Sequence, residues 1–270
     1  MRPRLRERGH PGPATGISVK TDAQIAAMRR AGKVVAAVLG ALQAVVAPGV
    51  ETAELDRVAE DIIRSHGARP SFKGYNGFPA SVCTSVNDEV VHGLPGRRVL
   101  REGDIVGIDV GAMVDGFHAD AAATFAVGEI APATRRLVQV TKQALEDGIA
   151  QARAGRTLRE LARAIEARVV ASGYSVVREL VGHGIGAAMH EPPQVPNYAA
   201  GANALKLRAG MTLAIEPMVN EGGCEITKDT DGWTFRTRDG GLSAHWEHTV
   251  AVGEDGAEIM TAPEGAGGGG

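Results

Sequence analysis

The sequence predicts an α+β fold that is built from two similar halves. Amphipathic helical segments alternate with short β-rich segments, and a helix pair followed by a β-rich segment occurs twice, about 106 residues apart. Aspartate and glutamate residues also lie inside apolar, strand-like runs, where an unpaired carboxylate is costly to bury. We therefore expect two halves that pack about a pseudo-two-fold axis and leave a site between them.

The first helix pair is predicted by capping residues and by apolar periodicity. One helix opens at Thr21, where Gln24 completes a capping box, and its apolar residues recur at helical spacing. A proline-glycine turn separates it from a second helix, which starts near Thr52 and ends at Gly67. Each helix is expected to bury one face.

The second helix pair repeats this arrangement. A helix over residues 132–152 is followed by one that opens at Thr157, with Glu160 as its capping-box partner, and ends at Gly173. The residues that match at the fixed offset are Gly49, Glu54, Leu55, Arg57, Glu60 and Gly67 in the first unit and Gly155, Glu160, Leu161, Arg163, Glu166 and Gly173 in the second.

A β-hairpin between the helix pairs brings two aspartates together. Residues 105–113 and 117–127 flank an Asp-Gly dipeptide, which is the strongest short-range hairpin signal. A two-residue turn there makes Asp109 and Asp120 diagonal neighbours on one face, about 7–8 Å apart at the backbone. Buried like charges repel, and no basic residue lies between them in the hairpin. This favours neutralisation by a metal ion over an ion pair.

Two further carboxylates lie in apolar runs. Glu216 is inside a strand-like run at 212–219, and Glu247 is inside another at 245–253. The alternative is that these strands are sheet edges whose glutamates face water. Four carboxylates and one imidazole would suit manganese, iron or cobalt better than a thiolate-type structural zinc. Four negative charges also balance two divalent ions, so a dinuclear centre is the expected stoichiometry.

The segment VGHGIGAAMHEPP, residues 181–193, is expected to supply the imidazole. It fits the dinucleotide pattern G-x-G-x-x-A, but that pattern must open a helix and the two prolines prevent one. It also lacks the second histidine of the H-E-x-x-H zinc motif. The glycines around His183 would let backbone and imidazole approach an ion closely, which makes His183 the expected nitrogen ligand.

Composition limits the class and the partners of the protein. The net charge of −3 argues against a dedicated nucleic-acid binder, and the most apolar stretch, residues 34–47, is too short to span a bilayer. Two cysteines and no signal-peptide pattern favour the cytoplasm. We expect a flexible tail at 1–19, a single catalytic domain at 20–262 and a glycine-rich tail at 263–270.

Five sequence blocks resemble those of type I methionine aminopeptidases in their bacterial form. The blocks are NGFPASVCTSVNDEVVHGLP, GDIVGIDVGAMVDGFHADAAATFAVG, GHGIGAAMHEPPQVPNY, GMTLAIEPMVN and LSAHWEHTVAV. The resemblance covers roughly residues 20–262. It implies a pita-bread fold, in which two pseudo-symmetric halves form a curved antiparallel sheet covered by helices and enclose a dinuclear metal site.

The resemblance also implies a role for each ligand. Asp109 resembles the bidentate ligand of one metal, and Asp120 and Glu247 resemble the carboxylates that bridge both. His183 and Glu216 resemble ligands of the second metal, with Glu216 also moving a proton. The implied cofactor is a pair of divalent ions, cobalt, manganese or iron, with zinc or nickel also accepted.

The implied reaction is hydrolysis of the first peptide bond after an N-terminal methionine, with a small second residue preferred. His92 and His190 resemble the non-ligand histidines that contact the scissile amide. Nascent polypeptide N-termini, met at the ribosome, are the implied partners, and a monomer is expected. The implied wall of the methionine pocket comprises Phe72, Tyr75, Phe78, Cys83, Met189 and Trp233.

Two other classes of protein compete with this interpretation. An Xaa-Pro peptidase or prolidase would share the metal ligands, but usually carries a large additional N-terminal domain, whereas only about twenty residues precede the first helix here. A non-catalytic binding protein of the same fold would have lost metal ligands, and all five are present. Cleavage of Met-Gly-Met rather than of Xaa-Pro peptides would separate these classes.

Overall fold

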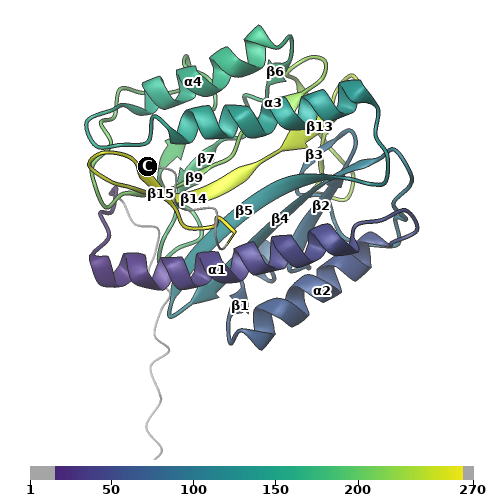
Figure 1. Cartoon of the computed structure of the whole chain (residues 1–270), viewed down its shortest axis with the longest axis horizontal. Helices are drawn as coiled ribbons and strands as arrows, with labels where there is room; N and C mark the ends of the chain where they lie inside the picture. Colours follow the sequence, from purple (N-terminus) through teal and green to yellow (C-terminus); the bar gives the residue numbers. More distant parts are fainter. Residues whose placement is uncertain (1–15, 264–270) are drawn as a thin grey trace, which may run out of the picture.

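The computed structural model describes residues 16–263, which form two helix pairs over an antiparallel sheet. Figure 1 shows the pairs above and below the strands, with α1 and α3 nearest the middle. The helices are α1 (Asp22–Val45), α2 (Thr52–Ser65), α3 (Pro132–Ile149) and α4 (Leu158–Ala171), with a short 3₁₀ helix, η1, at Tyr75–Gly77.

The main sheet has nine strands, of which seven follow the order β1-β4-β5-β14-β9-β7-β8, while β2 pairs with β4 and β15 with β14. Its strands are β1 (Arg69–Pro70), β2 (Val82–Val86), β4 (Ile105–Val114), β5 (Phe117–Ala126), β7 (Gly182–Gly184), β8 (Glu191–Val195), β9 (Thr212–Ile215), β14 (Glu247–Val252) and β15 (Ala257–Ile259).

Two smaller three-stranded sheets complete the described fold. One has the order β13-β10-β6 and the other β11-β12-β3. Their strands are β3 (Glu89–Val91), β6 (Ser175–Val176), β10 (Met218–Asn220), β11 (Ile226–Lys228), β12 (Phe235–Thr237) and β13 (Ser243–His245).

The predicted duplication is visible in the order of the strands. The centre of the main sheet lies between β5 and β14, with β2 and β4 outward on one side and β7 and β9 outward on the other. Each half has its own helix pair and its own apolar cluster, one beneath α1 and α2 and the other beneath α3 and α4. Both capping boxes are present, at Thr21 with Gln24 and at Thr157 with Glu160. The seam between the halves therefore runs along the β5–β14 pair.

The hairpin has the predicted register, with Val114 opposite Phe117 and Gly111 opposite Asp120. Its turn residues, Asp115 and Gly116, both have positive φ angles, 51° and 80°, as a type I′ turn requires. Side chains alternate between faces along a strand. Neighbouring apolar residues of β4 and β5 are buried in the cluster beneath α1 and α2, which leaves both aspartates on the other face.

Two of the predicted continuous strands were wrong, because each is broken at a site residue or directly beside one. The 212–219 run divides into β9 and β10 around Glu216 and Pro217, and the 245–253 run divides into β13 and β14 at Trp246. Proline has no N–H for the ladder, and the two parts of each run enter different sheets. The third helix also ends at Ile149, three residues before the predicted boundary at residue 152.

The predicted domain limits at residues 20 and 262 stay predictions. Residues 1–15 and 264–270, which make up most of the two predicted tails, lie outside the described residues. Residues 16–20 do contact the rest of the fold, since Ser18 donates a hydrogen bond to Glu191 and Lys20 N–H donates one to Gly210 O. Within residues 16–263, no helix has both the length and the apolarity that a bilayer-spanning segment needs.

Two glycines of α1 should respond to alanine in opposite directions. A Cβ at Gly32 would lie 2.2 Å from the backbone oxygen of Met260, whereas a Cβ at Gly40 would meet nothing within 4 Å. We expect Gly32→Ala to lower the free energy of unfolding by about 1–3 kcal/mol, because the packed backbone has to move. Gly40→Ala should raise it by roughly 0.5–1 kcal/mol through helix propensity. Urea unfolding measures both, and equal shifts would contradict the close α1–Met260 packing.

Candidate metal centre

A cavity of about 170 Å³ lies on the face of the main sheet away from the helices and reaches the seam between the halves. Thirteen of its lining residues are the predicted site residues, and the fourteenth, Asn76, was not predicted. The lining comprises Phe72, Tyr75, Asn76, Phe78, Cys83, His92, Asp109, Asp120, His183, Met189, His190, Glu216, Trp233 and Glu247. The structure thus brings all the candidate residues to one place.

The main sheet determines where the acidic residues lie. Ala122 of β5 is opposite Asp109 of β4 on one side and opposite Glu247 of β14 on the other, so the three form one row. Asp120 lies two residues from Ala122, on the same face of β5. Glu216 follows directly after β9, the next strand beyond β14. The carboxylates therefore converge from both halves of the fold.

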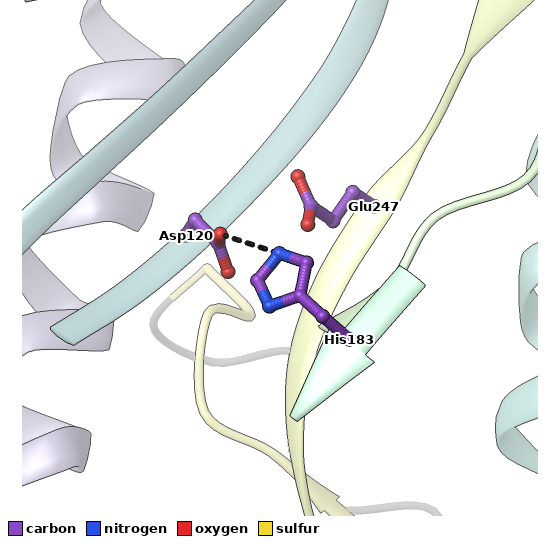
Figure 2. Close-up of side chains that lie close together, drawn as sticks. All are labelled: Asp120, His183 and Glu247. Atoms are coloured by element: carbon purple, nitrogen blue, oxygen red, sulfur yellow. Dashed lines mark ion pairs between the residues drawn. The ribbon is translucent and has the colours of Figure 1, made fainter. Parts of the chain in front are cut away.

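His183 faces the carboxylates from β7. Figure 2 shows its ring pointing toward Asp120, which comes from the facing strand, with the carboxylate of Glu247 beside the ring. Ligand atoms of these three residues all lie within 4.8 Å of one another. His183 Nε2 is 3.6 Å from Asp120 Oδ2 and 3.6 Å from Glu216 Oε1. Two donors at ~2.1 Å from one ion lie about 3.0–3.5 Å apart, so these spacings are close to those of a shared cation.

The hydrogen bond of His183 determines which nitrogen is free. Its Nδ1 is 2.9 Å from the carbonyl oxygen of Gly184, and because a carbonyl only accepts, Nδ1 carries the proton. Burial lowers the pKa of His183 to about 4, so the ring is neutral near pH 7 and Nε2 has an available lone pair. That lone pair faces the carboxylates, as a metal ligand requires.

The polar atoms of the site fit a cation better than they fit one another. Asp109 Oδ1 is buried and has no hydrogen-bond partner among residues 16–263. No lysine or arginine is among the described residues that line the cavity. Burial raises the pKa of Asp120 to about 6, and burial with neighbouring carboxylates raises the pKa values of Asp109, Glu216 and Glu247 well above their usual range. Divalent cations would stabilise the ionised carboxylates against both the burial and the mutual repulsion that raise these pKa values.

Apolar side chains form the rest of the wall. Phe78 and Trp233 meet edge to face with ring centroids 5.1 Å apart, and both belong to an apolar cluster with Phe72 and Met189. The thiol of Cys83 is buried, and burial raises its pKa, so it is neither a thiolate nucleophile nor a ready metal ligand. The cavity therefore has a charged floor and an apolar wall.

The two histidines that were predicted to contact substrate lie on different loops. His190 packs against His183 with ring centroids 4.2 Å apart, and its Nδ1 is 2.8 Å from the hydroxyl of Tyr75. His92 has a left-handed φ of 59° and is partly buried, and burial lowers its pKa to about 4. Both rings line the cavity without belonging to the group of Asp120, His183 and Glu247, whose ligand atoms could hold a metal ion.

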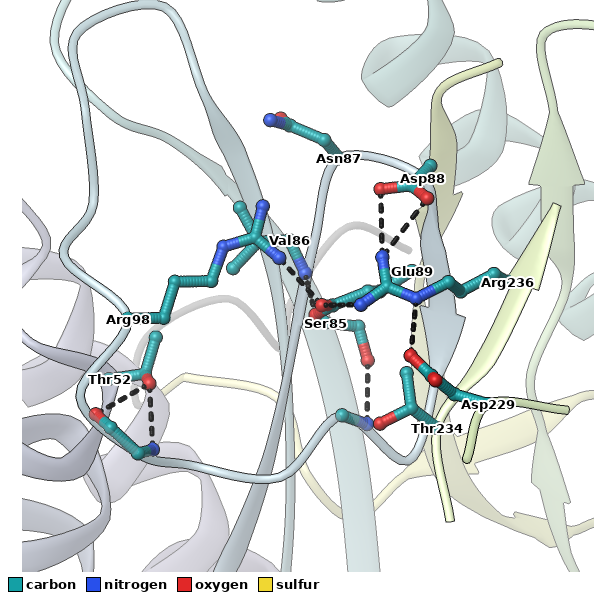
Figure 3. A network of polar contacts seen from close by, with 12 residues as sticks. Thr52, Ser85, Val86, Asn87, Asp88, Glu89, Arg98, Asp229, Thr234 and Arg236 are labelled. Carbon is teal, nitrogen blue, oxygen red and sulfur yellow. Dashed lines mark hydrogen bonds and ion pairs between the residues drawn. The ribbon is translucent and has the colours of Figure 1, made fainter. Parts of the chain in front are cut away.

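A polar network supports the loop that carries His92. Figure 3 shows the guanidinium of Arg236 between three acidic residues from two other segments of the chain. It is 2.7 Å from Asp229 Oδ2, 3.0 Å from Asp88 Oδ2 and 2.8 Å from Glu89 Oε1. These contacts join β12 to β3, the strand that ends directly before His92. The network was not predicted, because its members come from distant parts of the chain.

Two residues at or beside the site were not predicted from the sequence. Asn76 lies in a Tyr-Asn-Gly turn with φ of 48°, and the presence of Asn before Gly was a turn signal. His245 is 3% exposed, and its Nε2 lies 3.8 Å from Glu216 Oε2. Its spacing of two residues from Glu247 was no usable signal, because the chain changes sheets between them.

Comparisons with known proteins place this geometry among metallopeptidases. The model described as metallopeptidase family M24 matches residues 26–254. The chain is 50% identical over 246 residues to a methionine aminopeptidase of Clostridium acetobutylicum, covering 91% of this chain and 98% of that protein. It is 45% identical over 268 residues to methionine aminopeptidase 1 of Mycobacterium tuberculosis, covering 97% and 99%.

Solved structures give the same result. A methionine aminopeptidase from Thermotoga maritima superposes with a TM-score of 0.90 at 44% identity, covering 92% of this chain and all of that one. A prolidase from Pyrococcus furiosus gives a TM-score of 0.75 at 22% identity, covering 91% of this chain and 66% of the prolidase, and so shares the fold alone. The predicted pita-bread fold is confirmed.

Proposed function

The chain belongs to metallopeptidase family M24, and from this premise we propose that it removes the N-terminal methionine of proteins and peptides with the help of divalent metal ions. The observation that carries the proposal is the convergence of four buried carboxylates and a neutral imidazole beside an apolar cavity. Prolidases share the fold at only 21–22% identity, whereas methionine aminopeptidases reach 50%.

We assign the metal-holding role to five residues. Asp109 would bind one ion, His183 and Glu216 the other, and Asp120 and Glu247 would bridge the two. Thr249 supports this arrangement because its hydroxyl, 2.9 Å from Asp120 Oδ1, orients that carboxylate. Bound divalent cations supply Lewis acidity and lower the pKa of the attacking water. Oxygen-rich ligands favour manganese, iron or cobalt, with zinc and nickel as acceptable substitutes.

The apolar wall selects the side chain of the first residue. Phe78 and Trp233, with Phe72 and Met189, offer dispersion contacts to a methionine thioether. A cavity of about 170 Å³ has room for one such side chain and little more. Because the free α-amine would be held at the carboxylate floor, at the ions that these residues would bind, only the first peptide bond would lie within reach of the reacting centre. A bulky second residue would crowd the exposed mouth near Tyr75, which favours a small one.

The remaining polar groups hold and move protons. We propose that His92 and His190 donate hydrogen bonds to the scissile amide, where negative charge develops in the transition state. Tyr75 supports this role, because its hydroxyl can donate to Nδ1 of His190 and so place the ring proton on Nε2. Glu216 would take the proton of the attacking water and pass it to the leaving amine.

The natural substrates that we propose are nascent chains at the ribosome. Methionine is the first residue of such chains, so the cytoplasm is the proposed location. No nucleic-acid recognition by the chain itself is needed, which agrees with the net charge of −3. The proposed functional unit is a monomer, because one chain supplies all five proposed ligands.

A peptide assay tests this function. Metal-free protein is supplied with Mn²⁺ or Co²⁺ and incubated with Met-Gly-Met or with an Xaa-Pro dipeptide. We expect release of methionine from Met-Gly-Met only when metal is present, and no cleavage of the Xaa-Pro bond. Met-Leu-Met, whose second residue is bulky, should react more slowly. Preferential cleavage of Xaa-Pro would indicate a prolidase, and no cleavage of either peptide would indicate a binding protein.

A further inference from the structure

His245 is a buried polar side chain that the proposed mechanism leaves without a role. It lies at the end of β13 and is 3% exposed, and its Nε2 has no hydrogen-bond partner among residues 16–263. An unsatisfied buried polar group costs about 1–3 kcal/mol, so such groups are rare without a functional reason. This nitrogen therefore requires an explanation.

The backbone of His245 is held at a fixed position. Its backbone N–H donates to the hydroxyl of Thr124 at 2.9 Å, and that hydroxyl is 2.8 Å from its carbonyl oxygen. On the other side, His245 is paired with Met218 of β10. Neighbours on two sides thus fix the backbone from which the imidazole extends, and because the residue is buried the ring has little room to turn.

The side chain that this nitrogen faces is Glu216. His245 Nε2 is 3.8 Å from Oε2 of Glu216, while the other oxygen, Oε1, is 3.6 Å from His183 Nε2. The backbone oxygen of Glu216 accepts a hydrogen bond from Asn197 Nδ2 at 3.1 Å, so the backbone is anchored. The two carboxylate oxygens therefore have different neighbours, one on the metal side and one on the side of His245.

We propose that His245 is a positioning residue for Glu216, an inference that rests on the proposed function. Its Nε2–H donates to Oε2 and leaves Oε1 as the oxygen available to a cation. An approach of about 0.6–1.1 Å makes the hydrogen bond, since N–H···O bonds are 2.7–3.2 Å long. Rotation of the Glu216 side chain can bring Oε2 this much closer when a cation binds Oε1. Carboxylate ligands are commonly fixed by such outer hydrogen bonds.

Metal affinity tests the role of His245. His245→Leu removes the donor at similar volume, His245→Gln keeps an N–H donor, and Trp246→Phe removes a neighbouring buried N–H that also has no partner among the described residues. Metal-free full-length proteins are titrated with MnCl₂ by calorimetry. We expect His245→Leu to weaken at least one Mn²⁺ dissociation constant about 10–100-fold. The other two variants should stay within about threefold of the wild type.

The melting temperature of the metal-free proteins separates positioning from packing. A role in packing alone would lower the melting temperature of His245→Leu and leave its Mn²⁺ affinity unchanged, which would overturn the inference. Equal weakening in His245→Gln and His245→Leu would also overturn it, because the donor would then be irrelevant. If wild-type protein bound no Mn²⁺, the proposed function itself would fail.

A measurement on the wild type does not depend on the folding of a variant. In ¹⁵N-histidine-labelled protein loaded with Zn²⁺, a diamagnetic ion, the His245 Nε2 should carry a slowly exchanging proton. Its resonance is assigned by its loss in His245→Gln. An Nε2 without a proton in the loaded state would contradict donation to Glu216.

Discussion

Asp109→Asn and Glu216→Gln should each lower kcat/KM for Met-Gly-Met by at least about 10³-fold, because several kcal/mol of metal-dependent stabilisation of the transition state are lost. Each substitution removes one negative charge from the buried floor and replaces a carboxylate oxygen with an amide. Asp109 Oδ1 has no hydrogen-bond partner among the described residues that could compensate for a lost ion. We expect bound Mn²⁺, measured by elemental analysis after dialysis, to fall from about two ions per chain to one or fewer.

The stability of the metal-free variants should change in the opposite direction. Four buried carboxylates repel one another, so removal of one charge should leave the melting temperature of metal-free protein equal to or above that of wild type. Asp115→Asn in the exposed turn of the same hairpin and Glu258→Gln at the surface are matched controls that should keep full activity. Normal turnover of Asp109→Asn after exhaustive metal removal would refute the dinuclear assignment.

His92→Ala and His190→Ala should lower kcat by about 10²–10⁴-fold while leaving Mn²⁺ affinity within about threefold of wild type. Both rings line the cavity, and neither belongs to the residues that we assign as metal ligands. The loss is expected in kcat rather than in KM, because the proposed hydrogen bonds form with charge that develops only in the transition state. This separation of rate from metal content distinguishes these histidines from His183.

The histidine variants need one control for backbone strain at the substituted position and one at an exposed histidine outside the site. His92 has φ of 59°, a left-handed conformation whose cost histidine already bears, so alanine should add little backbone strain, and the melting temperature of the variant is measured in parallel. His66→Ala, at the exposed end of α2, should change neither rate nor metal content. Loss of bound metal in both His92→Ala and His190→Ala would mean that their roles are misassigned.

The most predictable parts of the fold depended on local chemistry. Thr21 and Thr157 predicted their helix starts because a capping box satisfies backbone N–H groups within four residues. The Asp-Gly turn predicted the hairpin register, and the register placed Asp109 and Asp120 on one face. The duplication was visible because each half must cap and bury its own helix pair.

The less predictable parts depended on contacts between distant segments. A continuous apolar run does not reveal that its chain changes sheets at Glu216 or at Trp246, since both parts are equally apolar. The Arg236 network joins segments about 147 residues apart, and local patterns carry no information on such pairs. His245 could not be predicted for the same reason, because its short distance to Glu216 results from the way β13 and β9 are placed in space.

The seam of the fold has a practical consequence for fragment complementation. Between β5 and α3 the chain passes through the exposed residues Gly128 and Glu129, and a cut there would divide it at the internal repeat. The N-terminal piece would retain two acidic donors and the C-terminal piece an imidazole and two glutamates. Neither piece alone has the full donor set, so methionine release would report on their reassembly. The molecule is thus a candidate scaffold for a split-enzyme sensor.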